Sequence, residues 1–155
     1  MSRLSRAVSC VAAIVCLTGT PAFANMGESG ASSTEANFVA GREAIEKQDW
    51  EGALGALRKA VAADPGNADA HNWLGFSYRK LGKYVESFSA YEEALRINPK
   101  HKAAHEYIGE AYLQTDQVRK AEEHLAELNR LCTPIPCEEY KDLKRAIDEY
   151  KKAHR

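Results

Sequence analysis

The sequence predicts an all-α fold, a curved stack of three helical hairpins closed by a C-terminal capping helix. Two phrases, ADPGNADAHNWLGFSY and INPKHKAAHEYIGEAY, lie 34 residues apart and share a proline, a histidine, a glycine and a tyrosine in register. Small side chains recur in columns at the same period. The last stretch of the chain carries one apolar stripe at helical spacing. A repeat of this length, made of helices, is typical of a solenoid.

The first 24 residues are predicted to be a secretory signal peptide. A basic start precedes an apolar run over residues 7–17, which is too short to cross a bilayer, and A-x-A ends the segment at Ala24. An uncleaved membrane anchor is the alternative. Residues 25–33 are small and polar, so we expect a flexible leader there. The mature chain is expected in the periplasm or secreted, without stable membrane insertion.

The charge of the chain argues against a nucleic-acid surface. The whole chain carries 21 Lys and Arg against 22 Asp and Glu. Cleavage removes two of those 21 basic residues, Arg3 and Arg6, and no acidic one, which leaves a net charge of −3. The residues that remain are enough for one domain and too few for two.

Columns of small residues appear when the chain is laid out at a period of 34. A glycine inside a helix costs about 1 kcal/mol relative to alanine. Three glycines in register therefore indicate that two antiparallel helices approach closely at this position. Prolines end the first two units, because proline cannot continue a helix. The residues expected to pack the repeats are Gly41, Ala53, Ala60, Pro65, Gly75, Tyr78, Ser87, Ala94, Pro99, Gly109, Tyr112 and Ala121.

The period and these residues resemble the tetratricopeptide repeat (TPR), whose signature is W-x2-L-G-x2-Y, then A-x3-F-x2-A, then P. The second unit agrees with it at Leu74, Gly75, Tyr78, Ala94 and Pro99. The leading Trp is absent from all three units, and His71 and His105 stand at its position in the second and third. The resemblance covers 34–133, in units 34–67, 68–101 and 102–133, and it implies a right-handed superhelix.

Each unit divides into two helices joined by a short turn. We expect helices over 34–47 and 51–63, 68–81 and 84–97, and 102–115 and 118–131, with turns at 48–50, 81–83 and 114–116. In the C-terminal segment 134–155, a seventh helix over 138–153 places Tyr140, Leu143, Ile147 and Tyr150 on one face. A solenoid needs its last apolar face covered, and this helix is the expected cap.

Cys132 and Cys137 are the only cysteines outside the leader. In an oxidising compartment such a pair is expected to form a structural disulfide, which would hold the capping helix against the last repeat. Two other interpretations are weaker. The spacing is not that of a C-x-x-C redox motif, and a zinc site would need two further ligands.

The resemblance implies a scaffold or adaptor that binds a protein or peptide in the concave groove lined by the first helix of each hairpin. The residues expected to face this groove are Phe38, Arg42, Ile45, Asn72, Trp73, Phe76, Arg79, Glu106, Tyr107 and Glu110. Aromatic and arginine side chains are common anchors of a partner. The alternative for single residues is a core position, or, for Arg79, an ion pair with Glu110.

The clamp that many family members use for a partner's C-terminal carboxylate is not reproduced. Its positions, which hold Lys, Asn, Asn, Lys and Arg in that clamp, correspond here to Phe38, Arg42, Trp73, Ala103 and Tyr107. The tails of cytosolic chaperones are therefore not the expected ligand.

Two other functions remain open. An envelope hydrolase or metal protein could use His71, His101 and His105, but neighbouring repeats should hold such residues about a helix diameter apart. Zinc ligands must lie within about 2.1 Å of one ion. With no G-x-S-x-G motif and no phosphate-binding loop, we expect no enzyme, metal or cofactor. A module that self-associates through its terminal hairpin is the second alternative.

Overall fold

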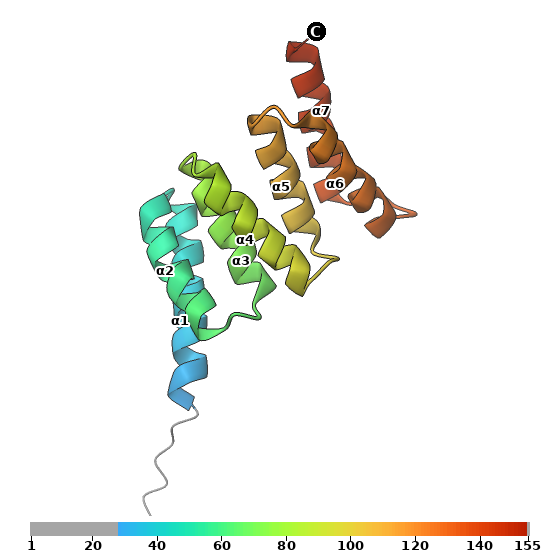
Figure 1. Cartoon of the computed structure of the whole chain (residues 1–155). Helices are drawn as coiled ribbons and strands as arrows, with labels where there is room; N and C mark the ends of the chain where they lie inside the picture. The colour runs from blue at the N-terminus through green and yellow to red at the C-terminus, as the bar shows by residue number, and fades with distance from the viewer. Residues whose placement is uncertain (1–27, 155) are drawn as a thin grey trace, which may run out of the picture.

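The computed structural model describes residues 28–154, so the predicted signal peptide and residues 25–27 of the leader lie outside the described residues. Within that range the chain is all-α and has no strand. The helices form a curved stack of antiparallel hairpins (Figure 1). Their bounds are α1 Glu28–Glu46, α2 Trp50–Ala63, α3 Ala68–Lys80, α4 Tyr84–Ile97, α5 Lys102–Gln114, α6 Val118–Leu131 and α7 Glu138–Ala153.

The helix boundaries lie within one residue of those predicted, except at the N-terminus. There α1 begins at Glu28, six residues before the expected start, so residues 28–33 are helical and the prediction of a flexible leader over them was wrong. The reason lies in helix cooperativity. No proline interrupts this segment, and extending a helix that is already nucleated costs little for each added residue.

The three turns inside the hairpins have the same construction. Gln48, Gly82 and Asp116, which are 34 residues apart, have positive φ angles of 58°, 70° and 58°. The next backbone N–H in each turn donates to a carbonyl five residues back, as in Lys83 N to Tyr78 O at 2.9 Å. This is the Schellman arrangement of a helix end. The repeat is therefore written in the turn geometry, although only Gly82 is a glycine.

The glycine column lies at helix contacts. A Cβ at Gly41 would fall 2.6 Å from Leu57 Cγ, and one at Gly75 would fall 2.7 Å from Tyr91 Cδ1. The third glycine differs, because Gly109 faces Leu143 of α7 and not its own hairpin partner. The small column Ala53, Ser87 and Ala121 is fully buried. In the central hairpin Ser87 Oγ also donates to Gly75 O at 2.8 Å.

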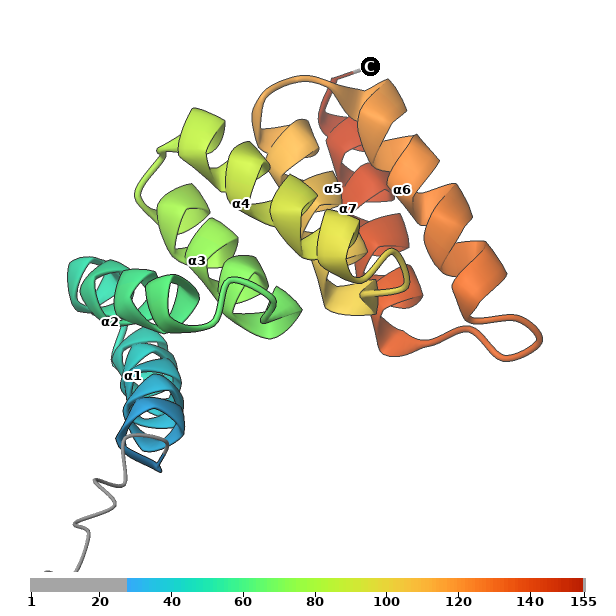
Figure 2. The ribbon, with the colours of Figure 1, turned by 60° about the horizontal axis from the view of Figure 1, so that its bottom comes forward.

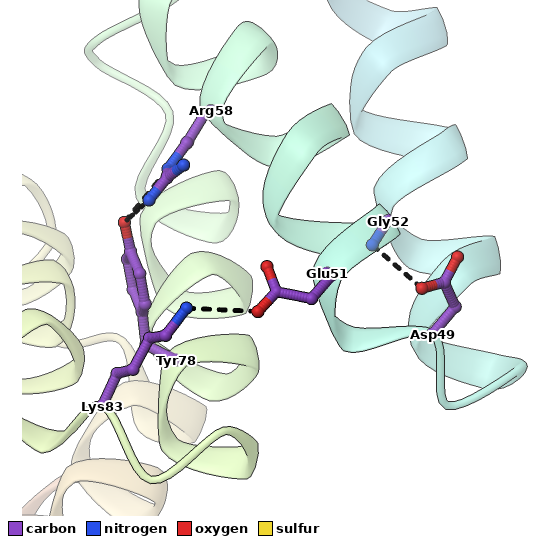
Figure 3. A network of polar contacts seen from close by, with 6 residues as sticks. All are labelled: Asp49, Glu51, Gly52, Arg58, Tyr78 and Lys83. Carbon is purple, nitrogen blue, oxygen red and sulfur yellow. Dashed lines mark hydrogen bonds and ion pairs between the residues drawn. The ribbon is translucent and has the colours of Figure 1, made fainter.

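Polar contacts tie the first hairpin to the second along the second helices (Figure 3). The Arg58 guanidinium on α2 donates to Tyr78 Oη at 2.8 Å and lies over the same ring at 5.5 Å. This contact raises the pKa of Arg58. Lys83 pairs with Glu51 across the same seam at 3.1 Å. The repeat tyrosine thus packs into the core and also orders the neighbouring hairpin.

The seventh helix covers the end of the stack. Leu143 and Ile147 are buried between α7 and the third hairpin, and Tyr140 and Tyr150 pack partly buried beside them. Cys132 and Cys137 are joined by a disulfide at the junction of α6 and α7, with their Cα atoms 5.4 Å apart. This bond needs an oxidising compartment, which stays a prediction from the leader.

The first helices line the inner side of the curve. Helix α3 contacts both α1 and α5, whereas within residues 28–154 the second helices α2, α4 and α6 do not contact one another. Elements on the inside of a bend approach more closely than those on the outside, and the curvature can be followed in Figure 2. We call the exposed face of α1, α3, α5 and α7 the inner wall. None of the described helices has the length and apolar character to cross a membrane.

Candidate partner-binding site on the inner wall

Four aromatic side chains from three helices meet on the inner wall. The Phe76 ring lies 6.0 Å from Trp50, 5.7 Å from Trp73 and 5.2 Å from Tyr107, measured between centroids. Trp73 and Tyr107 lie 6.1 Å apart. All four rings are half-buried. We call these residues the aromatic cluster.

Cationic side chains rest on the rings of the aromatic cluster. Arg42 of α1 lies 5.3 Å above Trp73, and Lys80 lies 5.2 Å above Phe76. Both cations are exposed, and neither forms an ion pair with a described residue. Such contacts attract a cation to the ring face while its charge stays accessible. The α1 and α3 side of the inner wall is therefore aromatic and positively charged.

Arg79 connects the two sides of the inner wall from below. Its guanidinium lies 5.3 Å from the Phe76 centroid and 2.6 Å from the Glu110 carboxylate, and its side chain is only 4% exposed. Arg79 Nε and Tyr91 Oη are both buried without a hydrogen-bond partner. Burial raises the pKa of the Tyr91 hydroxyl, although the Arg79 charge opposes this. The floor therefore contains a partly unsatisfied polar network.

Carboxylates gather on the α5 and α7 side. Burial raises the pKa of Glu106 to about 8, and the charges of Glu110, Asp142 and Glu139 raise it further. Glu110 pairs with Arg79, and Asp142 pairs with Arg145 at 2.7 Å. Neither Glu106 nor Glu139 forms an ion pair with a described residue. Burial also raises the pKa of the neighbouring Tyr107, with Glu106 as the next cause.

A cleft of about 500 Å³ opens where α3, α5 and α7 come together near their C-terminal ends. Apolar atoms dominate its deeper part, and the charged residues of both signs stand around it. Its lining is Arg79, Lys80, Glu110, Leu113, Gln114, Ala146, Glu149, Tyr150 and Ala153. This volume suits one or two side chains of a partner better than a whole cofactor.

The ten residues predicted for the groove are placed in three ways. Arg42 is exposed, and Trp73, Phe76, Glu106, Tyr107 and Glu110 are half-buried on the inner wall. Phe38 and Ile45 pack against the core of the first two hairpins. Asn72 and Arg79 are buried, at 1% and 6% exposed, so their prediction as open groove positions was wrong. The central helix α3 is covered by hairpins on both sides, which encloses positions at the edge of its inner face.

Several residues of this site were not predicted. Trp50 was expected in a turn, but it opens α2 and joins the aromatic cluster. Lys80 follows Arg79 at the end of α3 and also reaches Trp50 at 5.9 Å. The carboxylates of α7 come from outside the repeats, so the period could not align them with α5. An excess of Glu and Asp on one face of α7 was the available signal.

The repeated histidines have a structural role. His71 Nε2 lies 3.1 Å from Pro65 O, and His105 Nε2 lies 3.0 Å from Pro99 O, each joining a first helix to the loop before it. His101 caps α5 by accepting from Ala104 N at 3.2 Å. Across residues 28–154 no three His, Cys, Asp or Glu side chains converge as a metal site would need.

One histidine pair was not predicted. His105 Nδ1 lies 2.9 Å from His124 Nδ1. Because His105 Nε2 donates to the Pro99 carbonyl, neutral His105 accepts at Nδ1, and His124 must donate from its own Nδ1. Burial lowers the pKa of His124 to about 4, with the His105 charge as the second cause.

Known proteins resemble this chain through the same repeat. Two sequence models of the tetratricopeptide repeat match it, over residues 38–101 and 78–131. Anaphase-promoting complex subunit 3 of Schizosaccharomyces pombe is 29% identical over 110 residues, which cover 65% of this chain and 16% of that protein. The chain thus spans about a sixth of this curated relative.

Solved structures show the same fold. The TPR2B domain of yeast Sti1, in its complex with pHsp70, superposes with a TM-score of 0.73 at 16% identity, over 79% of this chain and 98% of that one. The type III secretion translocator chaperone SycD of Yersinia enterocolitica gives a TM-score of 0.68 at 19% identity, over 79% and 91% of the two chains. With both sequence models inside the three hairpins, the chain belongs to the tetratricopeptide repeat family.

Proposed function

We propose that this protein is a periplasmic adaptor or scaffold that binds a protein or peptide partner on its inner wall. The observation that carries this proposal is the aromatic cluster, half-buried and joined to two exposed cations, Arg42 and Lys80. Rings that are packed on one face and accessible on the other lose little side-chain entropy when a partner covers them. Solvated faces of helices seldom hold such a group.

The fold supports a peptide or protein as the class of partner, because the Sti1 domain was solved with pHsp70. The positions of the carboxylate clamp differ, however. Phe38 and Trp73 replace polar clamp residues with apolar ones, and both lie against the core or the aromatic cluster. The partner would therefore be held by apolar and aromatic contacts, with charged groups setting its register, and not by its C-terminal carboxylate.

A binding role without catalysis fits the chemistry of the site. The repeated histidines are held by the carbonyls of Pro65 and Pro99, which leaves them no position for proton transfer to a substrate. The largest charged groups of the inner wall are tied to rings or to one another. These arrangements suit recognition of a partner.

The periplasm as the compartment is supported by the leader and by the cysteine pair. A signal peptide would deliver the chain to an oxidising space, where the Cys132–Cys137 bond could form. N-terminal sequencing of the protein recovered from the envelope tests this directly. A mature chain that starts at Asn25 is expected, and a chain that retains Met1 in the cytoplasm would contradict the proposal.

Crosslinking in the native envelope tests the binding function. Wild-type protein should capture a reproducible partner, and the Arg42→Ala/Lys80→Ala variant should lose most of it. The matched control is Lys59→Ala/Arg119→Ala, which removes two exposed cations from the second helices α2 and α6. Equal capture by both variants would place the partner elsewhere on the molecule and contradict the proposed site.

A further inference from the structure

We propose that the α5 and α7 half of the inner wall binds a partner segment in which a Lys or Arg lies next to an apolar side chain. This inference rests on the proposed function and adds the chemistry of the partner. Its parts are the cleft at the ends of α3, α5 and α7, and the carboxylates beside it.

The cleft supplies the place for the apolar side chain. Leu113 of α5 and Ala146, Tyr150 and Ala153 of α7 give it an apolar lining, and about 500 Å³ accommodates a leucine or phenylalanine side chain with its backbone. Arg79 also lines the cleft, and its buried Nε has no acceptor. Buried donors are nearly always satisfied, so this atom favours a ligand that brings a carbonyl oxygen.

Charge complementarity identifies the neighbouring residue as basic. Three carboxylates on this half, Glu106, Glu139 and Glu149, form no ion pair with a described residue, while Glu110 and Asp142 are neutralised by arginines. The mutual repulsion and partial burial that raise the pKa of Glu106 would be relieved by a cation placed beside it. The Tyr107 ring adjoins Glu106, and a ring next to a carboxylate is a favourable setting for a guanidinium or ammonium group.

The α3 side fixes the direction of the segment. Lys80 stands at the α3 edge of the cleft, where a second cation would be repelled. The basic residue must therefore lie toward α5 and α7, and the part of the segment that crosses α3 must be neutral or acidic. A partner that carries the same residues in the opposite order should bind less well.

Selection from a displayed library of random peptides tests this inference on the mature chain. Parallel selections use wild type, Glu106→Gln/Glu139→Gln, and the matched control Glu92→Gln/Glu123→Gln. The control carboxylates lie on α4 and α6, close enough together that both raise the pKa of Tyr112. All these changes keep the side-chain size, so the folded structure is retained.

Wild type and control should enrich peptides with Lys or Arg adjacent to a large apolar residue. Fluorescence polarisation of the most enriched peptide should then show about tenfold weaker binding to Glu106→Gln/Glu139→Gln, which corresponds to ~1.4 kcal/mol. The affinity of wild type should also fall as salt is added, because the contact is electrostatic.

The outcomes separate this inference from the proposed function. Enriched peptides without basic residues, or peptides bound equally by Glu106→Gln/Glu139→Gln, would overturn the inference while a peptide-binding inner wall stands. No enrichment with any of the proteins would overturn both. Light scattering that shows a dimer, together with loss of that dimer in Ala146→Arg, would make a second copy the occupant and overturn the inference alone.

Discussion

The Arg79 guanidinium lies 2.6 Å from the Glu110 carboxylate, so a nearly buried ion pair joins the second hairpin to the third under the inner wall. The two side chains are 4% and 28% exposed. Both sites predicted for an open groove are therefore used, at least in part, to hold neighbouring repeats together. Binding surface and repeat interface overlap at these two residues.

Removal of one partner of this ion pair should destabilise the fold. Glu110→Gln leaves the Arg79 charge buried without its counter-ion, and we expect a loss of roughly 3 kcal/mol in the free energy of unfolding. Urea denaturation followed by circular dichroism measures this. The control is Glu51→Gln, which breaks the exposed pair with Lys83 and should cost less than about 0.5 kcal/mol. Equal effects of the two changes would mean that burial of the Arg79 pair is unimportant.

Glycine at the first turn should stabilise the protein. Gln48 has a φ of 58°, which costs a residue with a Cβ about 1 kcal/mol relative to glycine. Gln48→Gly should therefore raise the free energy of unfolding by about 0.5–1 kcal/mol, and Gly82→Ala should lower it by a similar amount. A differential scan of both variants against wild type should show opposite shifts of Tm. A loss of stability in Gln48→Gly would show that its side chain contributes more than the turn strain.

Two glycines inside helices should respond oppositely to alanine. In Gly75→Ala the added Cβ would lie 2.7 Å from the Tyr91 ring, which would force the hairpin apart and cost roughly 1–3 kcal/mol. Gly55→Ala on α2 meets nothing within 4 Å and should stabilise the fold by up to about 1 kcal/mol. Guanidinium denaturation of the pair compares the two directly. If Gly75→Ala were as stable as Gly55→Ala, the close approach at the glycine column would be refuted.

The helices could be predicted from sequence because each unit carries its own signals. Pro65 and Pro99 stop the second helices, and Asn67 and His101 cap the helices that follow by accepting from Ala70 N and Ala104 N. These signals are local, so they do not depend on neighbouring hairpins. The same reasoning failed before residue 34, where no residue marks the start of α1.

The candidate site depended on contacts that a period of 34 does not contain. Burial of Asn72 follows from its place in a central helix, which helical spacing within one repeat cannot express. Glu106 meets Glu139 and Asp142 only because α7 folds back beside α5. His105 and His124 meet across their hairpin, and the position of His124 holds Ala90 one repeat earlier, so no shared column announced the pair.

The His124 pair should make the fold sensitive to acid. The pKa of His124 is lowered to about 4 in the folded chain, whereas an unfolded histidine titrates near 6.5. Between these values the unfolded chain binds more protons, so stability is complete above pH ~6.5 and falls as the pH drops toward ~4. The loss should reach roughly 2–3 kcal/mol.

His124→Gln tests this pH dependence, because glutamine can still donate to His105 Nδ1 but does not titrate. Urea denaturation at pH 7, 5.5 and 4.5 should show a flatter pH profile for His124→Gln than for wild type. His71→Gln is the control, since His71 bonds only a carbonyl and has no histidine neighbour among its described contacts. An unchanged slope in His124→Gln would assign the acid sensitivity to other groups.

Glu106 should have the opposite pH dependence. Its folded pKa is about 8 against 4.5 in its ordinary state, so the folded chain binds more protons between these values and stability falls as the pH rises through them. Glu106→Gln should therefore raise Tm at pH 8 and leave it nearly unchanged at pH 4.5, where the carboxyl is protonated in both states. Glu92→Gln on α4, an exposed position, should change Tm little at either pH. Carbon NMR of the Glu106 carboxyl gives its pKa independently, and titration at the ordinary value would remove the basis for this prediction. A raised value would mean that the isolated protein keeps this carboxylate at a cost in stability, as expected of a group that acquires its counter-ion from a partner.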